Sequence, residues 1–197
     1  MAQLNFSKVF QGGIFMNIAV RFSVIFMLLL TCLFGVELNN LSSVCAMSLA
    51  HPEDGVYSLQ PQSSPGYELA VQNAGTNNGA NVVIWQINNG NNQRWKFERL
   101  GGGNYYKITA ENSGRSLDVE GKIGVNGANL QVWSYAYQGN QQFLIWDCGD
   151  GYYVIQPNLS GNYVLDVDHG KSYNGNNVII WTASGQSNQK WKLVRFS

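Results

Sequence analysis

The sequence predicts an all-β fold in which three repeats close into one barrel. A five-residue motif recurs every 48 residues, as NNQRW (91–95), GNQQF (139–143) and SNQKW (187–191). An upstream tryptophan keeps the same interval, at Trp85, Trp133 and Trp181, and a fixed period of this length is typical of repeated architecture. In addition, short apolar runs alternate with glycine and asparagine clusters, which is the pattern of strands and turns.

The three copies span residues 55–100, 103–148 and 151–196. Each holds about four short strands, such as those predicted at 164–167 and 178–181. No window keeps a helical period for more than two turns, and 22 glycines interrupt the chain, which argues against a helical solenoid. Propellers use roughly 4 to 8 blades, so three copies favour a closed threefold barrel.

The segment 1–50 differs from the repeats. Basic residues precede an apolar run at 22–36, and small residues near Ala46 and Ala50 offer cleavage sites, the order of a secretory signal peptide. We therefore interpret 1–50 as a signal peptide and short leader, and 51–197 as one domain of a secreted, extracellular protein. An uncleaved anchor is the alternative, because the apolar run of 15 residues is not far below the about 20 that span a bilayer.

Composition limits the possible partners. Residues 51–197 contain 10 Lys and Arg against 11 Asp and Glu, a net charge of −1, without a basic run. Nucleic acid is therefore not an expected partner, and a membrane is expected only through the leader if it stays uncleaved. With two histidines, His51 and His169, and no nucleophile signature, we predict no metal site, no cofactor and no catalytic residues.

The repeated elements resemble a known family. The order LDV, glycine-rich turn, VxxW and NQxW is similar to the QxW repeat of the ricin B-chain type lectins, which occur as free lectins and as carbohydrate-binding modules of enzymes. The resemblance covers 55–197. It implies a β-trefoil, in which three hairpins cap a six-stranded barrel, and a non-enzymatic lectin. Its implied partners are glycans of the galactose, N-acetylgalactosamine or xylan type.

The aromatic residue of each NQxW copy is predicted to be structural. In an extended strand, a Gln and an aromatic residue two positions apart face the same side, and a large ring can fill the centre where three lobes meet. We expect this of Trp95, Phe143 and Trp191. The Gln amide can bind loop backbone that would otherwise be buried unpaired.

The resemblance also implies which residues bind sugar. In ricin-type lectins an aspartate accepts hydrogen bonds from sugar hydroxyls, the aromatic residue of VxxW stacks on the ring, and the Asn of the NQ pair adds a polar contact. Carried over, the second repeat supplies Asp118, Gln131, Trp133, Asn140 and Gln141. The third repeat supplies Asp166, Ile179, Trp181, Asn188 and Gln189, with Ile179 in place of an amide.

The first repeat is predicted to be silent or weak, because Ala70 and Val83 occupy the positions of Asp118 and Gln131. Its Trp85 persists, so this tryptophan position can also serve packing. A buried aspartate needs a partner, which could be a backbone amide or a sugar. A non-catalytic protein-interaction or toxin-accessory module, using the repeats only as a scaffold, is the alternative function.

Overall fold

The structure is a computed structural model that describes residues 47–196 of the 197-residue chain. These residues carry all three repeats, preceded by a short strand, β1 (Ser48–Leu49). The predicted signal segment lies outside the described residues except for its last four. Within the described part, no helix is both long and apolar enough to cross a membrane.

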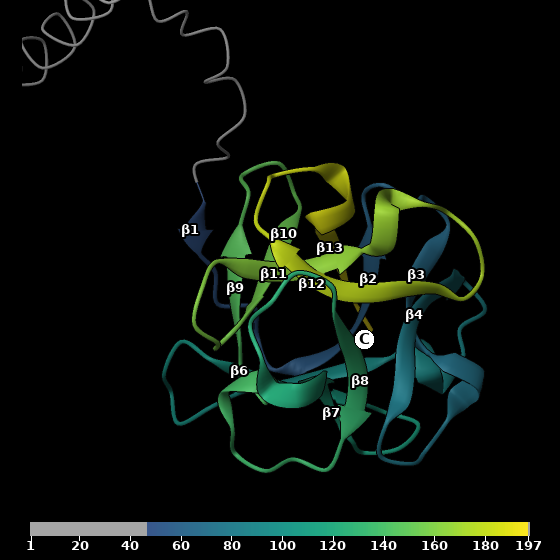
Figure 1. Cartoon of the computed structure of the whole chain (residues 1–197), viewed down its shortest axis with the longest axis horizontal. Coiled ribbons are helices and arrows are strands. Elements are labelled where there is room, and N and C mark those ends of the chain that lie inside the picture. Colours follow the sequence, from purple (N-terminus) through teal and green to yellow (C-terminus); the bar gives the residue numbers. More distant parts are fainter. Residues whose placement is uncertain (1–46, 197) are drawn as a thin grey trace, which may run out of the picture. The chain divides into compact units, whose positions relative to one another are not determined.

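Each repeat folds into four short strands (Figure 1). The first repeat forms β2 (Gly55–Pro61), β3 (Tyr67–Val71), β4 (Ala80–Gln86) and β5 (Trp95–Arg99). The second forms β6 (Tyr106–Ala110), β7 (Ser116–Val119), β8 (Ala128–Trp133) and β9 (Phe143–Asp147). The third forms β10 (Tyr153–Pro157), β11 (Tyr163–Val167), β12 (Asn176–Thr182) and β13 (Trp191–Arg195). The all-β prediction is confirmed.

The first and last strands of the three repeats form a closed barrel. Antiparallel pairing runs from β2 to β5, β6, β9, β10 and β13, and β13 pairs again with β2. Closure of this kind removes the free edges of a sheet. Strand β1 pairs with the C-terminal end of β9, at Trp146 and Asp147. The backbone N–H of Ala50 donates to the Ile145 carbonyl at 2.8 Å.

The middle strands form three hairpins that cap the barrel. The hairpins β3–β4, β7–β8 and β11–β12 meet one another through pairs between β4, β8 and β12. At the meeting point Asn81, Asn129 and Asn177 form a ring, in which each side-chain amide donates to the next at 2.9 to 3.0 Å. A barrel capped in this way is a β-trefoil, as predicted.

A glycine joins each hairpin to a neighbouring lobe. These are Gly79, Gly127 and Gly175, whose N–H groups donate to carbonyls of β8, β12 and β4 at 2.9 to 3.0 Å. Their φ angles of 83°, 86° and 86° lie in the left-handed region that glycine tolerates best. The repeated glycines of the sequence therefore mark the joints between lobes.

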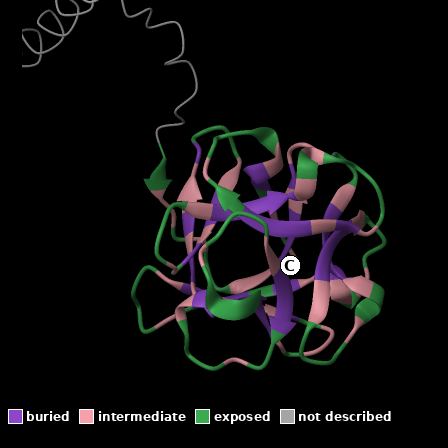
Figure 2. Ribbon diagram, in the orientation of Figure 1, coloured by how far each residue is buried: buried purple, intermediate pink, exposed green. Residues whose placement is uncertain are grey.

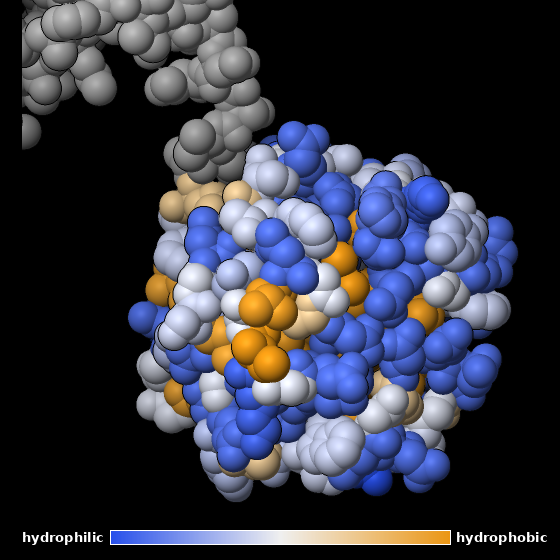
Figure 3. All heavy atoms as spheres, viewed as in Figure 1, coloured by the Kyte–Doolittle hydropathy of each residue, from blue (hydrophilic) through white to orange (hydrophobic). Residues whose placement is uncertain are grey.

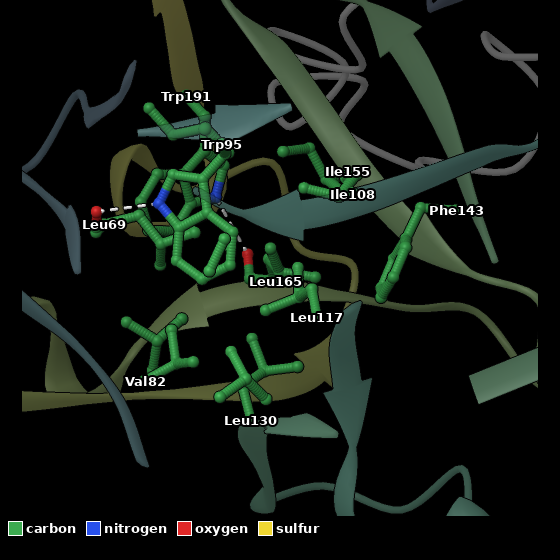
Figure 4. Close-up of a cluster of buried hydrophobic side chains, with 14 of the residues drawn as sticks. Leu69, Val82, Trp95, Ile108, Leu117, Leu130, Phe143, Ile155, Leu165 and Trp191 are labelled. Atoms are coloured by element: carbon green, nitrogen blue, oxygen red, sulfur yellow. Dashed lines mark hydrogen bonds between the residues drawn. The ribbon is translucent and has the colours of Figure 1, made fainter. Parts of the chain in front are cut away.

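The predicted core aromatics are fully buried and belong to the cluster of hydrophobic side chains drawn in Figure 4. Buried residues follow the strands, and exposed residues lie mainly in the loops (Figure 2). The indole N–H of Trp95 donates to the Leu69 carbonyl at 3.0 Å, and that of Trp191 to the Leu165 carbonyl at 3.3 Å. Phe143 has no such donor, and the matching Leu117 carbonyl accepts the Ser116 hydroxyl at 3.2 Å instead. The structural interpretation of these three rings is confirmed.

The Gln side chain of each motif binds loop backbone, as predicted, but the Gln residue does not lie in a strand. Gln93, Gln141 and Gln189 each end a one-turn 3-10 helix just before the strand begins. Their side-chain oxygens accept backbone N–H groups at 2.7 to 3.0 Å, and their amides donate to carbonyls at the preceding strand end. Backbone groups that the turn leaves unpaired are thereby satisfied.

Candidate functional site

The same cross-strand pair occupies the middle of each hairpin. In the antiparallel ladders Asp118 lies opposite Gln131, Asp166 opposite Ile179, and Ala70 opposite Val83. Side chains of directly opposed residues lie on one face of the sheet and contact each other. The second lobe therefore presents a carboxylate with an amide, the third lobe a carboxylate with an aliphatic group, and the first lobe two aliphatic groups.

In the second lobe, two side-chain amides hold the buried carboxylate. Gln131 donates to Oδ1 of Asp118 at 2.9 Å, and Asn140 donates to its Oδ2 at 2.8 Å. Asn140 also donates to the Val119 carbonyl at 3.1 Å. The carboxylate lies at the wall of an open hollow of about 350 Å³ that Trp133 also lines. The five predicted residues of this lobe all line this hollow.

The third lobe holds its carboxylate with different amides. Asn188 donates to Oδ1 of Asp166 at 2.7 Å, and Gln189 donates to Oδ2 at 2.8 Å. Ile179 has no amide to donate, and the Gln189 amide supplies the second hydrogen bond to this carboxylate instead. The five predicted residues line a smaller hollow of about 220 Å³.

Burial raises the pKa of both carboxyls above the ordinary aspartate value. Around Asp118 the amides of Gln131, Gln141 and Asn140 oppose this shift. Around Asp166 the amides of Gln189 and Asn188 oppose it. Burial disfavours the charged form of a carboxyl, whereas hydrogen bonds donated to the carboxylate favour it. The partners of both carboxylates are side-chain amides and not the backbone amide that the sequence left open.

The tryptophans of the two lobes are open to solvent. Trp133 is 42% exposed and Trp181 is 43% exposed, whereas Trp85 of the first lobe is half-buried. On the face shown in Figure 3, hydrophobic residues form small clusters within a largely hydrophilic surface. An exposed indole beside a carboxylate offers an apolar face and a hydrogen-bond acceptor to one ligand.

The first lobe keeps a hollow but lacks the carboxylate. Its hollow of about 240 Å³ is lined by Ala70 and Trp85 together with Asn88 and Asn92. The amide of Asn92 donates to the Val71 carbonyl at 2.9 Å, which matches the backbone bond of Asn140 in the second lobe. The hollow therefore belongs to the fold, and the carboxylate is what distinguishes the other two lobes.

Several lining residues were not predicted from the sequence. Glu120, Lys122 and Gln138 line the second hollow, and Asp168, His169 and Gln186 line the third. The 48-residue period could have indicated two of these pairs, since Gln138 aligns with Gln186 and Glu120 with Asp168. The spacing alone does not indicate that these loops reach the hollow.

A family model described as ricin-type β-trefoil lectin domain-like matches residues 47–133 and 139–197. The chain belongs to this family. Members are generally non-catalytic carbohydrate-binding domains, so family and fold together support a carbohydrate-binding lectin. A search among curated proteins finds no match.

Solved structures share this ricin-type architecture. A designed threefold-symmetric protein, ThreeFoil, is 41% identical, with a TM-score of 0.68 over 73% of this chain and 100% of its own. The exo-β-1,3-galactanase 1,3Gal43A from Clostridium thermocellum is 32% identical, with a TM-score of 0.67 over 75% of this chain and 31% of its own. A ricin B-like lectin from Macrolepiota procera, solved with lactose, is 20% identical, with a TM-score of 0.63 over 74% and 99%.

Proposed function

We propose that this protein is a secreted, non-enzymatic lectin that binds galactose-type sugars through its second and third lobes. The observation that carries the proposal is a buried carboxylate beside an exposed tryptophan in two lobes, whereas the first lobe has only the tryptophan. The proposed site residues are Asp118, Gln131, Trp133, Asn140 and Gln141, and Asp166, Ile179, Trp181, Asn188 and Gln189.

Each carboxylate keeps acceptor capacity for sugar hydroxyls. A carboxylate has about four lone-pair sites, and the side-chain amides described above occupy one on each oxygen of Asp118 and of Asp166. The remaining sites suit two adjacent hydroxyls of one sugar. The exposed tryptophan would then cover the apolar C–H face of the ring.

The galactose class is supported by the similarity to 1,3Gal43A, which is 32% identical to this chain. The part of 1,3Gal43A that matches this chain covers 31% of an exo-β-1,3-galactanase. A binding module within such an enzyme would meet galactose-containing chains. N-acetylgalactosamine and xylan-type sugars are the competing ligands, and they belong in the same test.

A glycan array with the purified protein tests the proposal, followed by calorimetry with free galactose, N-acetylgalactosamine and xylobiose. We expect galactose-terminated glycans to bind. A shallow site of one carboxylate, one ring face and a few amides should give millimolar affinity, near −4 kcal/mol. A folded protein that binds no glycan on the array would contradict the proposal and favour the protein-interaction module.

Secretion is part of the proposal, with cleavage after Ala46. Cleavage there leaves strand β1 in the mature chain, whereas cleavage after Ala50 would remove it together with the Ala50 hydrogen bond to β9. Mass spectrometry of protein from the culture medium should find an N-terminus at Met47. Secreted protein that still contains the apolar run at 22–36 would contradict this.

A further inference from the structure

An unusual tyrosine lies on the loop that borders the second-lobe hollow. Tyr137 is 80% exposed, the most exposed large hydrophobic residue of the described part, and its φ is 60°. A bulky side chain rarely adopts this left-handed backbone. The matching positions hold Asn89 and Gly185, with φ of 59° and 73°, and these residue types tolerate such angles.

The surrounding loop holds this backbone in place. The Ala136 N–H donates to the Gln141 side chain at 2.7 Å, and the Gln142 amide donates to the Tyr137 carbonyl at 3.5 Å. The other two lobes form the corresponding bond to Gln93 or Gln189 without a tyrosine. The fold therefore requires the turn but not the aromatic ring, and an outlier that the fold does not require indicates a function.

A second tyrosine supports the ring. The Tyr135 and Tyr137 ring centroids are 4.6 Å apart with planes inclined by 53°. Lys107 lies 5.4 Å from the Tyr135 ring centroid and is paired with Glu98 at 2.7 Å. The third lobe has Ala183 and Gly185 in place of the two tyrosines. The first lobe has Ile87 and Asn89 there, so the aromatic pair is confined to the lobe with the largest of the three hollows.

The loop that carries the pair borders the proposed sugar position. Ala136 and Gln138, the chain neighbours of Tyr137, both line the hollow that contains Asp118 and Trp133, whereas the two tyrosines lie outside its lining. A ligand that extends from this hollow across the loop therefore meets the tyrosines. Pyranose rings present an apolar C–H face to such rings, and an exposed phenol can also bond a hydroxyl.

We propose that Tyr135 and Tyr137 form a second sugar subsite, so that the second lobe binds an oligosaccharide and the third lobe a single sugar. This inference rests on the proposed function. Tyr137 is the specificity-determining residue, because its ring is the exposed one, and Tyr135 positions it. An aromatic platform of this kind should improve the affinity for the longer ligand by about three- to tenfold.

Calorimetry with one active lobe tests the subsite. Asp166→Ala silences the third lobe, and Trp181→Ala serves instead if that variant does not fold. The ligands are galactose and three disaccharides of galactose, with β-1,3, β-1,4 and β-1,6 linkages. We expect at least one disaccharide to bind about three- to tenfold more tightly than galactose. Adding Tyr137→Asn, the residue type of the first lobe, should remove most of this gain and leave galactose affinity within about twofold.

The matched control is Tyr173→Asn, which removes another exposed tyrosine, 52% exposed and in the hairpin loop of the third repeat. It should change neither affinity. Tyr137→Asn should also leave the thermal midpoint unchanged or raise it, because it relieves the backbone strain.

Other outcomes would contradict either the subsite alone or the galactose specificity as well. Disaccharides that bind no more tightly than galactose, a gain that survives Tyr137→Asn, or a clear loss of thermal stability in that variant would overturn the subsite alone. If none of the four sugars binds, the proposed galactose specificity fails, and this inference fails with it.

Discussion

The second and third lobes place a buried carboxylate at the same position but hold it with different amides. In the second lobe the cross-strand Gln131 donates to Asp118, and the hydrogen bonds of Gln141 go to the loop. In the third lobe Ile179 cannot donate, and Gln189 bonds both the loop and Asp166. Each carboxylate accepts two short hydrogen bonds, one on each oxygen, and the Gln141 amide of the second lobe also lowers the pKa of Asp118.

This difference shows that a residue with a structural role can also complete a binding site. The Gln of the NQxW motif has two amide hydrogens, and Gln189 uses its amide for Asp166 at 2.8 Å and for the Thr182 carbonyl at 3.0 Å. The third lobe therefore depends on one side chain for two purposes. The second lobe divides these purposes between Gln131 and Gln141.

The largest expected effect is on binding to a clustered glycan, which needs both lobes. Two weak sites on a rigid barrel can raise apparent affinity by roughly 10² to 10⁴. Asp118→Ala and Asp166→Ala should each lose most of this gain, measured on an immobilised polyvalent galactoside. Calorimetry with free sugar should fit about two sites in the wild type and one in each variant.

The double variant Asp118→Ala/Asp166→Ala should bind neither form of the sugar. Asp150→Ala is the matched control, because Asp150 is a surface carboxylate paired with Lys190 and lines neither hollow. If the double variant binds as tightly as the wild type, the site assignment is wrong and another surface carries the function.

The next effect contrasts the core with the site within the third lobe. Trp191→Ala removes a fully buried indole and should lower the free energy of unfolding by about 3 to 5 kcal/mol. Phe143→Ala should cost a similar amount in the second lobe. Trp181→Ala should cost about 1 kcal/mol or less, because Trp181 is 43% exposed, yet abolish binding at the third lobe. Urea unfolding and calorimetry measure the two quantities, and an unchanged stability of Trp191→Ala would refute its core role.

The period of 48 predicts an all-β fold of three lobes, because it shows which residues share one environment, and the resemblance to ricin-type lectins implied the β-trefoil and the residues of the two proposed sites. The period could not show that Gln189 turns its amide towards Asp166, since that depends on the direction of a side chain and on the absence of a donor at Ile179. It also could not show that Gln93 ends a 3-10 turn. Local backbone geometry and side-chain rotamers decide these points, and the same sequence spacing is compatible with several geometries and rotamers.

A third prediction tests the double role of Gln189 directly. Gln141→Ala and Gln189→Ala both leave loop backbone groups unpaired, but only Gln189→Ala removes a hydrogen bond that holds Asp166. Because hydrogen bonds to charged groups contribute about 1.5 to 3 kcal/mol, Gln189→Ala should be the less stable variant by about that amount. It should also weaken third-lobe binding, whereas Gln141→Ala should largely retain second-lobe binding. Equal losses of stability and binding in the two variants would show that the lobes do not differ in this way.

The smallest expected effect is a difference in how the two lobes respond to acid. Burial raises the pKa of Asp118 and of Asp166, so the folded protein binds these protons more readily than the unfolded chain. Protonation therefore favours the fold, and the contribution of these groups to stability falls as pH rises through their raised pKa values. Sugar binding has the opposite sign, because only the ionised carboxylate accepts hydroxyl hydrogen bonds on both oxygens. As pH falls, sugar binding should therefore be lost at a higher pH than an ordinary aspartate would give, because both pKa values are raised. The folded state should not lose stability from these two groups over the same range.

The lobes should differ within that range. Lys122 lowers the pKa of Asp118, whereas Asp168 raises that of Asp166 more than His169 lowers it. As pH falls, the third lobe should therefore lose its sugar before the second. Calorimetric titrations between pH 7 and pH 4, with Asp118→Ala to isolate the third lobe and Asp166→Ala to isolate the second, measure the two midpoints. Asp168→Asn should lower the third-lobe midpoint, because it removes the neighbouring negative charge. If instead the second lobe loses binding at the higher pH, the neighbouring charges do not set the order in which the two lobes lose their sugar.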